Sequence, residues 1–361
     1  MRVAILQNVV APTRHALFAA LGREPGIELT VLFMAQREAG RSWGGTEPLA
    51  YPHRFLGGVH VPLRTEGGYD VLHVNPAVVP LLLRERYDAL LAAGFLSPTA
   101  WLALVASRHA KTAFLLWFGS SWPAMGLRSR LATPLKRALV RGSARVVAYG
   151  ALAREQALAL GADPARVGIA LNTTDVRPFA EADREAARAA LGVDGPVLLW
   201  CGRFVPRKRV DLVVSLAARL PAAELLLAGS GPGRDEAERE ARVRGIRARF
   251  LGEVRYADLP TLYAAADLFV TRAEREPWGL VVNEALAAGV PVLASTGVVA
   301  ARELVPDGGG CVSDDEDELT TAAEALLASA DARERARSVL PRITPEAWAA
   351  AVAAQLRRAV G

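Results

Sequence analysis

Hydrophobic positions along the chain fall into short apolar runs, which alternate with longer stretches of helical spacing. In the first half, such runs predict buried strands at residues 3–7, 29–34, 71–74, 89–92, 112–117 and 146–149. A second set predicts strands at residues 197–201, 224–228, 248–251, 268–271 and 290–294. Apolar strands separated by helices are typical of parallel sheets covered on both faces. The pattern therefore predicts an α/β protein with two Rossmann-like domains.

A polar turn separates the two sets of strands. The turn Leu-Asn-Thr-Thr-Asp at residues 171–175 precedes a charged segment of helical spacing at residues 178–190. We place the first domain at residues 1–172 and the second at residues 173–344. The last segment, 345–361, follows a threonine and opens on a proline, a typical start for a helix, and its spacing predicts an amphipathic helix to Arg358.

Length and composition restrict the class of protein. A chain of 361 residues can bury two cores of ordinary size, so a single small binding module is not expected. Hydrophobic residues make up 52% and charged residues 22%, which indicates a folded rather than a disordered chain. Cys201 and Cys311 lack the spacing of a metal site or a disulfide framework, and this fits a reducing cytoplasm. The apolar run after Arg2 ends at Gln7, so no export signal is predicted.

Residues 89–107 carry no charge, and a membrane span is one interpretation of that stretch. Gly94, Ser97 and Pro98 interrupt it. Ser97 is a typical N-cap, and Pro98 suits the first position of a helix. The sequence therefore favours a buried strand followed by a helix.

The net charge of +5 is unevenly distributed. Residues 1–172 contain 19 Lys or Arg and 10 Asp or Glu, a net charge of +9, which leaves 24 against 28, or −4, for the remainder. No acidic residue lies between Asp88 and Glu155, whereas the basic residues there are Arg108, Lys111, Arg128, Arg130, Lys136, Arg137, Arg141, Arg145 and Arg154. Such a surface would attract an anionic acceptor or an anionic membrane face, and an arginine-rich solvated face is the alternative. No nucleic-acid motif accompanies the charge, so a nucleic-acid partner is not expected.

Two glutamates eight positions apart, Glu276 and Glu284, flank a predicted helix start. Gly279 would let the backbone approach a ligand, and the first helical amides, near Leu280 and Val281, would bind an anion. Carboxylates beside a bound phosphate can accept hydrogen bonds from sugar hydroxyls. The segment therefore suits a ligand with phosphates and sugar rings, such as a nucleotide sugar. Taken alone, two such glutamates are also compatible with solvated residues at a helix start.

Arg203 and Lys208 follow a predicted strand, at the edge where open parallel sheets bind ligands. Their spacing can place a guanidinium and an ammonium on one diphosphate. The chain holds three lysines against 40 arginines (43 − 3), so a lysine at position 208 indicates a need for a compact charge. A surface pair on a loop is the alternative.

Together these motifs resemble the family 4 retaining glycosyltransferases. Residues 276–292, with the sequence EPWGLVVNEALAAGVPV, resemble the family's E-x7-E signature. Residues 201–208 resemble its strand-ending G-R-x4-K element, and residues 227–232 resemble its G-x-G-P turn. Residues 250–254 and 262–267 follow in the family's order. The N-x-x-x-P-x-R opening at residues 8–14 and the Ala-Tyr-Gly at 148–150 resemble an exopolysaccharide-type branch.

The resemblance implies a GT-B fold, in which two Rossmann-like domains face each other across a cleft and helix 345–361 packs back on the first domain. It implies a retaining hexosyltransferase that moves a sugar from a nucleotide-diphosphate donor to an acceptor hydroxyl, with no metal and no bound cofactor. Glu276, Arg203 and Lys208 would be catalytic, with Glu276 on the transferred sugar and Glu284 on the ribose. The donor-binding residues implied are Arg203, Lys208, Gly229, Gly231, Val254, Glu276, Gly279, Leu280, Val281 and Glu284.

The acceptor side is expected in the first domain, where Asn8, Arg14, His15 and Gly119 are the candidates. Arg14 would hold a phosphate or the acceptor, whereas His15 is equally compatible with a core or surface role. No histidine occurs at residues 116–121, so no catalytic base is named. In the second domain we expect Trp278 to be a packing residue. Arg209 stands where the family usually has glycine.

Two other functions stay open. A nucleotide-sugar epimerase or phosphorylase can use the same fold, and a catalytically dead protein can still bind sugar nucleotides. The arginine and alanine bias indicates a GC-rich bacterial genome, in which such enzymes make polysaccharides, lipid-linked glycans or natural products. We expect a cytoplasmic enzyme, either free or peripheral at the inner membrane face. The sequence leaves the donor nucleotide, the sugar and the acceptor open.

Overall fold

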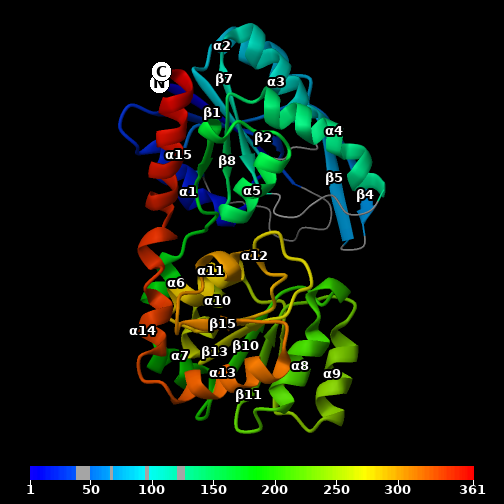
Figure 1. Cartoon of the computed structure of the whole chain (residues 1–361), viewed down its shortest axis with the longest axis vertical. Coiled ribbons are helices and arrows are strands. Elements are labelled where there is room, and N and C mark those ends of the chain that lie inside the picture. The colour runs from blue at the N-terminus through cyan, green and yellow to red at the C-terminus, as the bar shows by residue number, and fades with distance from the viewer. Residues whose placement is uncertain (38–48, 66–67, 94–96, 120–126) are drawn as a thin grey trace. The chain divides into compact units, whose positions relative to one another are not determined.

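The computed structural model describes residues 1–37, 49–65, 68–93, 97–119 and 127–361 (Figure 1). These residues form two compact units, Met1–Asp175 with Pro345–Gly361, and Val176–Thr344. The sequence placed this boundary after residue 172. Gly94, Ser120 and Ser121 lie outside the described residues, as do the side chains of Arg128 and Arg130.

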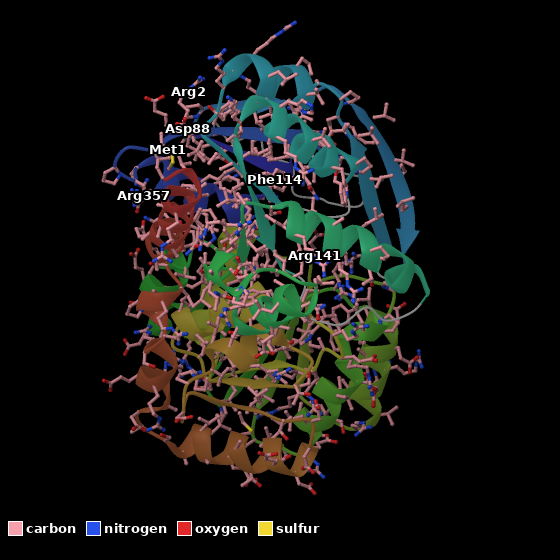
Figure 2. All side chains as sticks on the ribbon, turned by 45° about the horizontal axis from the view of Figure 1, so that its top comes forward. Met1, Arg2, Asp88, Phe114, Arg141 and Arg357 are labelled. Atoms are coloured by element: carbon pink, nitrogen blue, oxygen red, sulfur yellow. The ribbon has the colours of Figure 1, made fainter. Side chains whose placement is uncertain are left out.

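In the first unit, the described residues form a seven-stranded parallel sheet in the order β3-β2-β1-β6-β7-β8-β9. Its strands are β1 (Arg2–Val9), β2 (Glu28–Ala35), β3 (His53–Phe55), β6 (Ala89–Ala93), β7 (Ala113–Phe118), β8 (Arg145–Ala148) and β9 (Val167–Ile169). At the start of β1, the Arg2 N–H donates to the Asp88 carboxylate at 2.7 Å, and the Asp88 N–H donates to the Arg2 carbonyl at 2.9 Å (Figure 2). These two bonds fix where β1 and β6 begin to pair.

The prediction that residues 71–74 join the parallel sheet is wrong. They belong to β5 (Gly68–Val74), which pairs antiparallel with β4 (Val59–Thr65) in a separate two-stranded ribbon. Parallel neighbours need a crossover connection of about a dozen residues or more, whereas β4 and β5 are consecutive strands with a short connection. The edge position beside β2 is taken instead by β3, which the sequence did not predict.

Alternation along β1 divides the core of the first unit into two layers. Val3 and Ile5 face one cluster, which contains Leu17 and Phe18 of α1 together with Trp348 of α15. Ala4 and Leu6 face the other cluster, to which helices α2, α3, α4 and α5 contribute. The helices of this unit are α1 (Pro12–Gly22), α2 (Val78–Glu85), α3 (Pro98–Ala110), α4 (Leu127–Gly142), α5 (Ala151–Ala159) and α15 (Pro345–Val360). The C-terminal helix α15 packs on α1 and on strands β7 and β8 (Figure 1).

The uncharged stretch at 89–107 is a strand and a helix, as predicted. Ser97 caps α3 by accepting a hydrogen bond from the Thr99 N–H at 3.2 Å, and Pro98 is the first helical residue. β6 ends before this helix at Ala93, and all five of its residues are buried. Across the described ranges, every helix is too short or too polar to cross a membrane.

In the second unit, six parallel strands lie in the order β12-β11-β10-β13-β14-β15. They are β10 (Val197–Cys201), β11 (Glu224–Ala228), β12 (Ala248–Gly252), β13 (Leu268–Thr271), β14 (Val292–Ala294) and β15 (Gly310–Val312). The chain runs outward from β10 to β12 and then returns to β13, on the other side of β10. The strand order therefore reverses between β10 and β13, and such a switch point is where open α/β sheets bind ligands.

Nine helices of the second unit and three short 3-10 turns surround its sheet. The helices are α6 (Arg177–Glu181), α7 (Arg184–Leu191), α8 (Val210–Ala218), α9 (Arg234–Val243), α10 (Leu259–Ala265), α11 (Leu280–Ala287), α12 (Val299–Leu304), α13 (Glu316–Ala328) and α14 (Ala332–Arg337). The turns are η2 (Pro206–Lys208), η3 (Tyr256–Asp258) and η4 (Leu340–Arg342). The single helix predicted at 178–190 is two helices, because Asp183 caps α7 by accepting a hydrogen bond from the Ala186 N–H at 2.9 Å.

Candidate active site

The loop after β10 carries the predicted diphosphate residues, and its backbone is held by the turn after β11. The Phe204 N–H donates to the Ser230 carbonyl at 2.9 Å, and the Gly233 N–H donates to the Phe204 carbonyl at 2.9 Å. The loop ends at Arg209, whose φ of 47° lies in the left-handed region. The position thus has the backbone conformation that a glycine adopts most readily, although an arginine occupies it.

The two glycines after β11 are required by this loop. A Cβ atom at Gly229, where φ is 142°, would lie 1.7 Å from the Gly202 carbonyl oxygen. A Cβ atom at Gly231, where φ is 147°, would lie 2.6 Å from the Phe204 carbonyl oxygen. The turn therefore allows a close approach between two segments of backbone. Its contribution to the site is to fix the loop that carries Arg203 and Lys208.

The loop after β13 is held from two sides. The Glu274 N–H donates to the Arg207 carbonyl of the neighbouring loop at 2.9 Å. The Glu276 N–H donates to the Gly297 carbonyl at 2.9 Å, beyond β14. The loops that flank the switch point are therefore joined by backbone hydrogen bonds.

The residues after Glu276 turn into helix α11. Trp278 is 4% exposed, and its indole N–H donates to Asn283 Oδ1 at 2.9 Å, so it packs at the helix start as predicted. Gly279 precedes the helix with a φ of 101°, a conformation that favours glycine. Leu280 and Val281 are half-buried in the first turn, where helical amides have no partner inside the helix. The loop thus brings a helix N-terminus to the switch point.

Lys208 and Glu276 meet across the switch point. Lys208 Nζ lies 2.5 Å from Glu276 Oε2, and the two side chains are 15% and 16% exposed. Arg207 Nη1 lies 3.5 Å from the same oxygen, so a second cation supports Glu276. Arg203 is exposed just beyond the end of β10. Arg207 was not predicted as a site residue, although its place beside Lys208 in a basic run was a usable signal.

Glu284 lies in a buried cluster of polar groups. It is 3% exposed, and its Oε2 accepts a hydrogen bond from the Tyr263 hydroxyl at 2.9 Å. The Tyr256 hydroxyl is a second group that favours the ionised form of this carboxyl. Burial raises the pKa of Glu284 to about 7, against the opposing effect of the two tyrosine hydroxyls. Neither tyrosine was predicted as a site residue.

Val254 lies just after β12, at the same edge of the sheet as the glycine turn. The Gly229 N–H donates to the Gly252 carbonyl at 2.7 Å, so the ends of β11 and β12 are adjacent. Val254 itself is half-buried. The residues predicted to bind the donor thus follow β10, β11, β12 and β13 at their carboxyl ends.

Two of the acceptor candidates, Arg14 and Gly119, contact other residues of the first unit. The Arg14 guanidinium donates to Asn172 Oδ1 at 2.7 Å and lies over the Trp117 ring, 4.6 Å from its centroid. A Cβ atom at Gly119 would lie 2.6 Å from the Tyr149 ring. These contacts give Arg14 and Gly119 packing roles in the first unit, whatever else they bind.

The other two acceptor candidates are His15 and Asn8. His15 Nδ1 lies 2.9 Å from the hydroxyl of Tyr51, a buried residue, which supports a packing role for this histidine. Asn8 is half-buried in β1.

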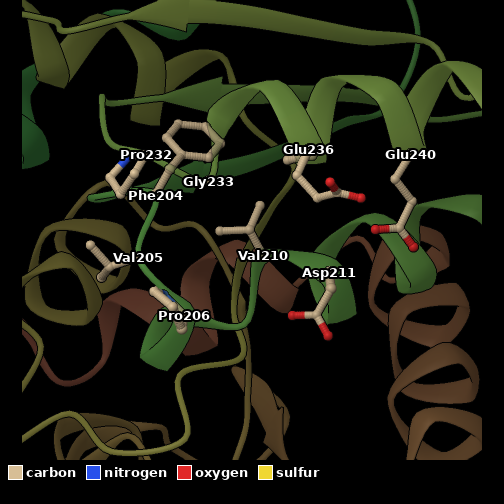
Figure 3. A pocket seen from close by; sticks show the side chains of 10 residues that line it. Phe204, Val205, Pro206, Val210, Asp211, Pro232, Gly233, Glu236 and Glu240 are labelled. Atoms are coloured by element: carbon tan, nitrogen blue, oxygen red, sulfur yellow. The ribbon is translucent and has the colours of Figure 1, made fainter. Parts of the chain in front are cut away.

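A cavity of about 330 Å³ lies between α8 and α9, beside the loop after β10 (Figure 3). Phe204, Val205 and Pro206 line it from the loop, and its carboxylates are those of Asp211, Glu236 and Glu240. Each carboxylate pairs with an arginine, at distances between 2.7 and 2.9 Å. No predicted donor-binding residue lines this cavity, so it is separate from the candidate site.

Within the described part of the chain, no group of three or more histidine, cysteine, aspartate or glutamate side chains is arranged to hold a metal ion.

Solved structures identify the fold as that of the GT-B glycosyltransferases. HepE of Anabaena, solved in complex with UDP, is 19% identical, with a TM-score of 0.78 over 99% of this chain and 100% of HepE. WaaG, a glycosyltransferase involved in lipopolysaccharide biosynthesis, is 19% identical, with a TM-score of 0.67 over 98% of both chains. Both have two α/β domains of the kind found here, so the predicted fold class is confirmed.

The family comparison concerns the unit that carries the candidate site. Residues 183–338 match the model of the family described as glycosyl transferases group 1. D-inositol 3-phosphate glycosyltransferase of Mycobacterium tuberculosis is 42% identical over 144 residues, which are 37% of this chain and 30% of that protein. The matched segment spans less than a third of the curated relative's length. These findings support a group 1 glycosyltransferase.

Proposed function

We propose that this protein is a retaining, metal-independent glycosyltransferase of family 4, in its exopolysaccharide-type branch. It moves a hexose from a nucleoside-diphosphate donor to an acceptor hydroxyl. The observation that carries the proposal is the juxtaposition of Lys208 and Glu276 at the switch point, beside the N-terminus of α11. A cation and helical amides suit a diphosphate, and a carboxylate suits sugar hydroxyls.

The charged groups act on the leaving group. When the bond between the anomeric carbon and the diphosphate oxygen breaks, negative charge develops on that phosphate. Lys208, Arg203 and the first amides of α11 stabilise this charge, and because they are held in place they need little reorganisation during the reaction. Glu276 accepts hydrogen bonds from the sugar, and its bond to Lys208 couples sugar position to phosphate position.

Retention follows from attack on the same face of the sugar that the leaving group occupies. The acceptor oxygen forms a bond to the anomeric carbon as the phosphate oxygen departs. That phosphate oxygen takes the proton of the acceptor hydroxyl, so no protein base is required. This agrees with the absence of histidine at residues 116–121 of the sequence.

The second unit would bind the donor. The first unit would bind the acceptor and any membrane partner. HepE is solved in complexes with UDP and with UDP-glucose, so UDP-glucose is the first donor to test. We assign the acceptor to the first unit, whose +9 charge suits an anionic acceptor or the anionic cytoplasmic face of a membrane. The enzyme would then work in the cytoplasm, free or at the inner membrane face.

Donor hydrolysis tests this proposal without a known acceptor, since water can replace the acceptor hydroxyl. We expect UDP-α-glucose to release UDP and α-glucose first, as seen by proton NMR, with the same rate in the presence of EDTA. β-Glucose as the first product would contradict retention. UDP-galactose would indicate an epimerase, and glucose 1-phosphate formed with added phosphate would indicate a phosphorylase. Calorimetry showing no binding of UDP-, GDP-, ADP- or dTDP-sugars would contradict the donor assignment.

A further inference from the structure

Three groups, Tyr263, Tyr256 and Cys201, surround the Glu284 carboxyl inside the second unit. Tyr263 is 0% exposed, and its hydroxyl donates to Glu284 Oε2 at 2.9 Å. The Cys201 thiol lies close to the same hydroxyl. A tyrosine hydroxyl has one proton to donate, and Glu284 accepts it. The Tyr263 hydroxyl therefore has a defined direction, toward the carboxylate.

The ring of Tyr263 is fixed as firmly as its hydroxyl. It packs edge-on against Phe179, with centroids 5.3 Å apart, and its plane is tilted by 32° against Phe269, with centroids 5.4 Å apart. Tyr263 comes from α10, Glu284 from α11 and Cys201 from the end of β10. The Tyr263 hydrogen bond thus joins α10 to the carboxylate on α11.

Tyr256 provides a second hydroxyl on the same carboxylate. It lies in η3, four residues after the end of β12, and is half-buried. Its ring is 6.0 Å from that of Phe179, the residue that also packs on Tyr263. Two tyrosines that share one aromatic neighbour therefore hold Glu284.

We propose that Tyr263 and Tyr256 are positioning residues for nucleotide recognition, which hold the Glu284 carboxylate in the orientation that accepts the two ribose hydroxyls. This inference rests on the proposed function, in which Glu284 binds the ribose. Each carboxylate oxygen has two acceptor positions, so the oxygen bonded to Tyr263 can still accept a ribose hydroxyl. The tyrosines reduce the cost of binding because the carboxylate is ordered before the nucleotide arrives.

The pH dependence of UDP affinity distinguishes a positioning role of the tyrosines from a purely structural role. The groups that face the carboxyl are Tyr263, Tyr256 and Cys201, and the arginines of α14 donate instead to the Ala288 carbonyl at the other end of α11. Helices α6 and α12 also pack on α11. The charged residues of α6 are Arg177 and Glu181, and those of α12 are Arg302 and Glu303. Ribose hydroxyls donate to the ionised carboxylate, so UDP affinity should rise with pH through the pKa of about 7. Removing a tyrosine hydroxyl that favours the ionised form should move this midpoint to higher pH.

The test compares UDP with 2′,3′-dideoxy-UDP by calorimetry, for the wild type, Tyr263→Phe and Tyr256→Phe. We expect the wild type to prefer UDP by about 100-fold at pH 8, because each hydrogen bond to a charged group is worth roughly tenfold or more. In Tyr263→Phe the preference should fall about tenfold and the pH midpoint should rise, while the affinity for dideoxy-UDP stays constant. Tyr87→Phe is the matched control, since Tyr87 donates to Glu85 at 3.0 Å in the first unit. It should keep the full preference.

The outcomes separate this inference from the proposed function. No UDP binding by the wild type would contradict the proposed function itself. UDP binding without a preference for the ribose hydroxyls would overturn the role of Glu284 and, with it, this inference. An unchanged preference and pH midpoint in Tyr263→Phe would overturn the inference alone. If Tyr263→Phe does not fold, as judged by its thermal melt, Tyr256→Phe decides: a reduced preference supports the inference and an unchanged one overturns it.

Discussion

Lys208→Ala should lower turnover of the donor by about 1,000-fold while leaving the fold intact, because removal of one group that stabilises developing charge typically costs two to three powers of ten. Lys208 Nζ is 2.5 Å from Glu276 Oε2 at the switch point, so its loss removes a positive charge from the phosphate site and also releases Glu276. The measurement is the initial rate of UDP release, with circular dichroism to confirm folding.

Two variants make this result specific. Lys208→Arg keeps the charge but changes its shape, and we expect an intermediate rate. Lys111→Gly removes a lysine from the left-handed position after α3, where φ is 58° and glycine fits without strain, so the rate should not change. Full activity in Lys208→Ala would contradict the assignment of this lysine to the diphosphate.

Gly229→Ala should destabilise the second unit by about 4 kcal/mol, the sum of roughly 2 for a strained backbone conformation and roughly 2 for overpacking. The added Cβ atom would meet the Gly202 carbonyl oxygen at 1.7 Å, and neither backbone segment can move without breaking the hydrogen bonds around Phe204. Urea unfolding measures the loss of stability. Calorimetry should show that UDP binding is lost as well, because the loop that carries Arg203 and Lys208 is displaced.

Gly245→Ala is the control for the strain alone. Gly245 also has a positive φ, of 67°, but a Cβ atom there meets nothing within 4 Å. We expect a cost of about 1 kcal/mol and unchanged UDP binding. Equal effects of the two substitutions would contradict the role of Gly229 in the close packing of the two loops.

Much of the fold could be predicted from the sequence because strands in doubly covered sheets are continuous apolar runs. The strands at 197–201, 224–228 and 268–271 match the predicted ranges, since a glycine or an arginine follows each of them. The ribbon of β4 and β5 was missed because apolar runs do not specify which strand pairs with which. The break within 178–190 was missed because Asp183 is only one polar residue among many in that charged segment.

The candidate site was predicted in part. The sequence indicates that Lys208 and Glu276 each follow a parallel strand, at the edge where such sheets bind ligands. It does not indicate that β10 and β13 are neighbours, so the contact between the two side chains could not be predicted. The role of Gly229 and Gly231 could not be predicted, since the backbone that approaches them comes from a different loop. Tyr263 was equally hidden: its contact with Glu284 joins α10 to α11, and a tyrosine in an apolar helix looks like any core residue. Long-range contacts of this kind leave no local pattern.

The most direct measurement is a crystal structure of the protein with UDP bound. We predict that the diphosphate lies within hydrogen-bonding distance of Lys208 Nζ and the amides of Leu280 and Val281, with the ribose hydroxyls on Glu284. A nucleotide bound away from the loops after β10 and β13, or Lys208 and Glu284 without contact to it, would contradict the account.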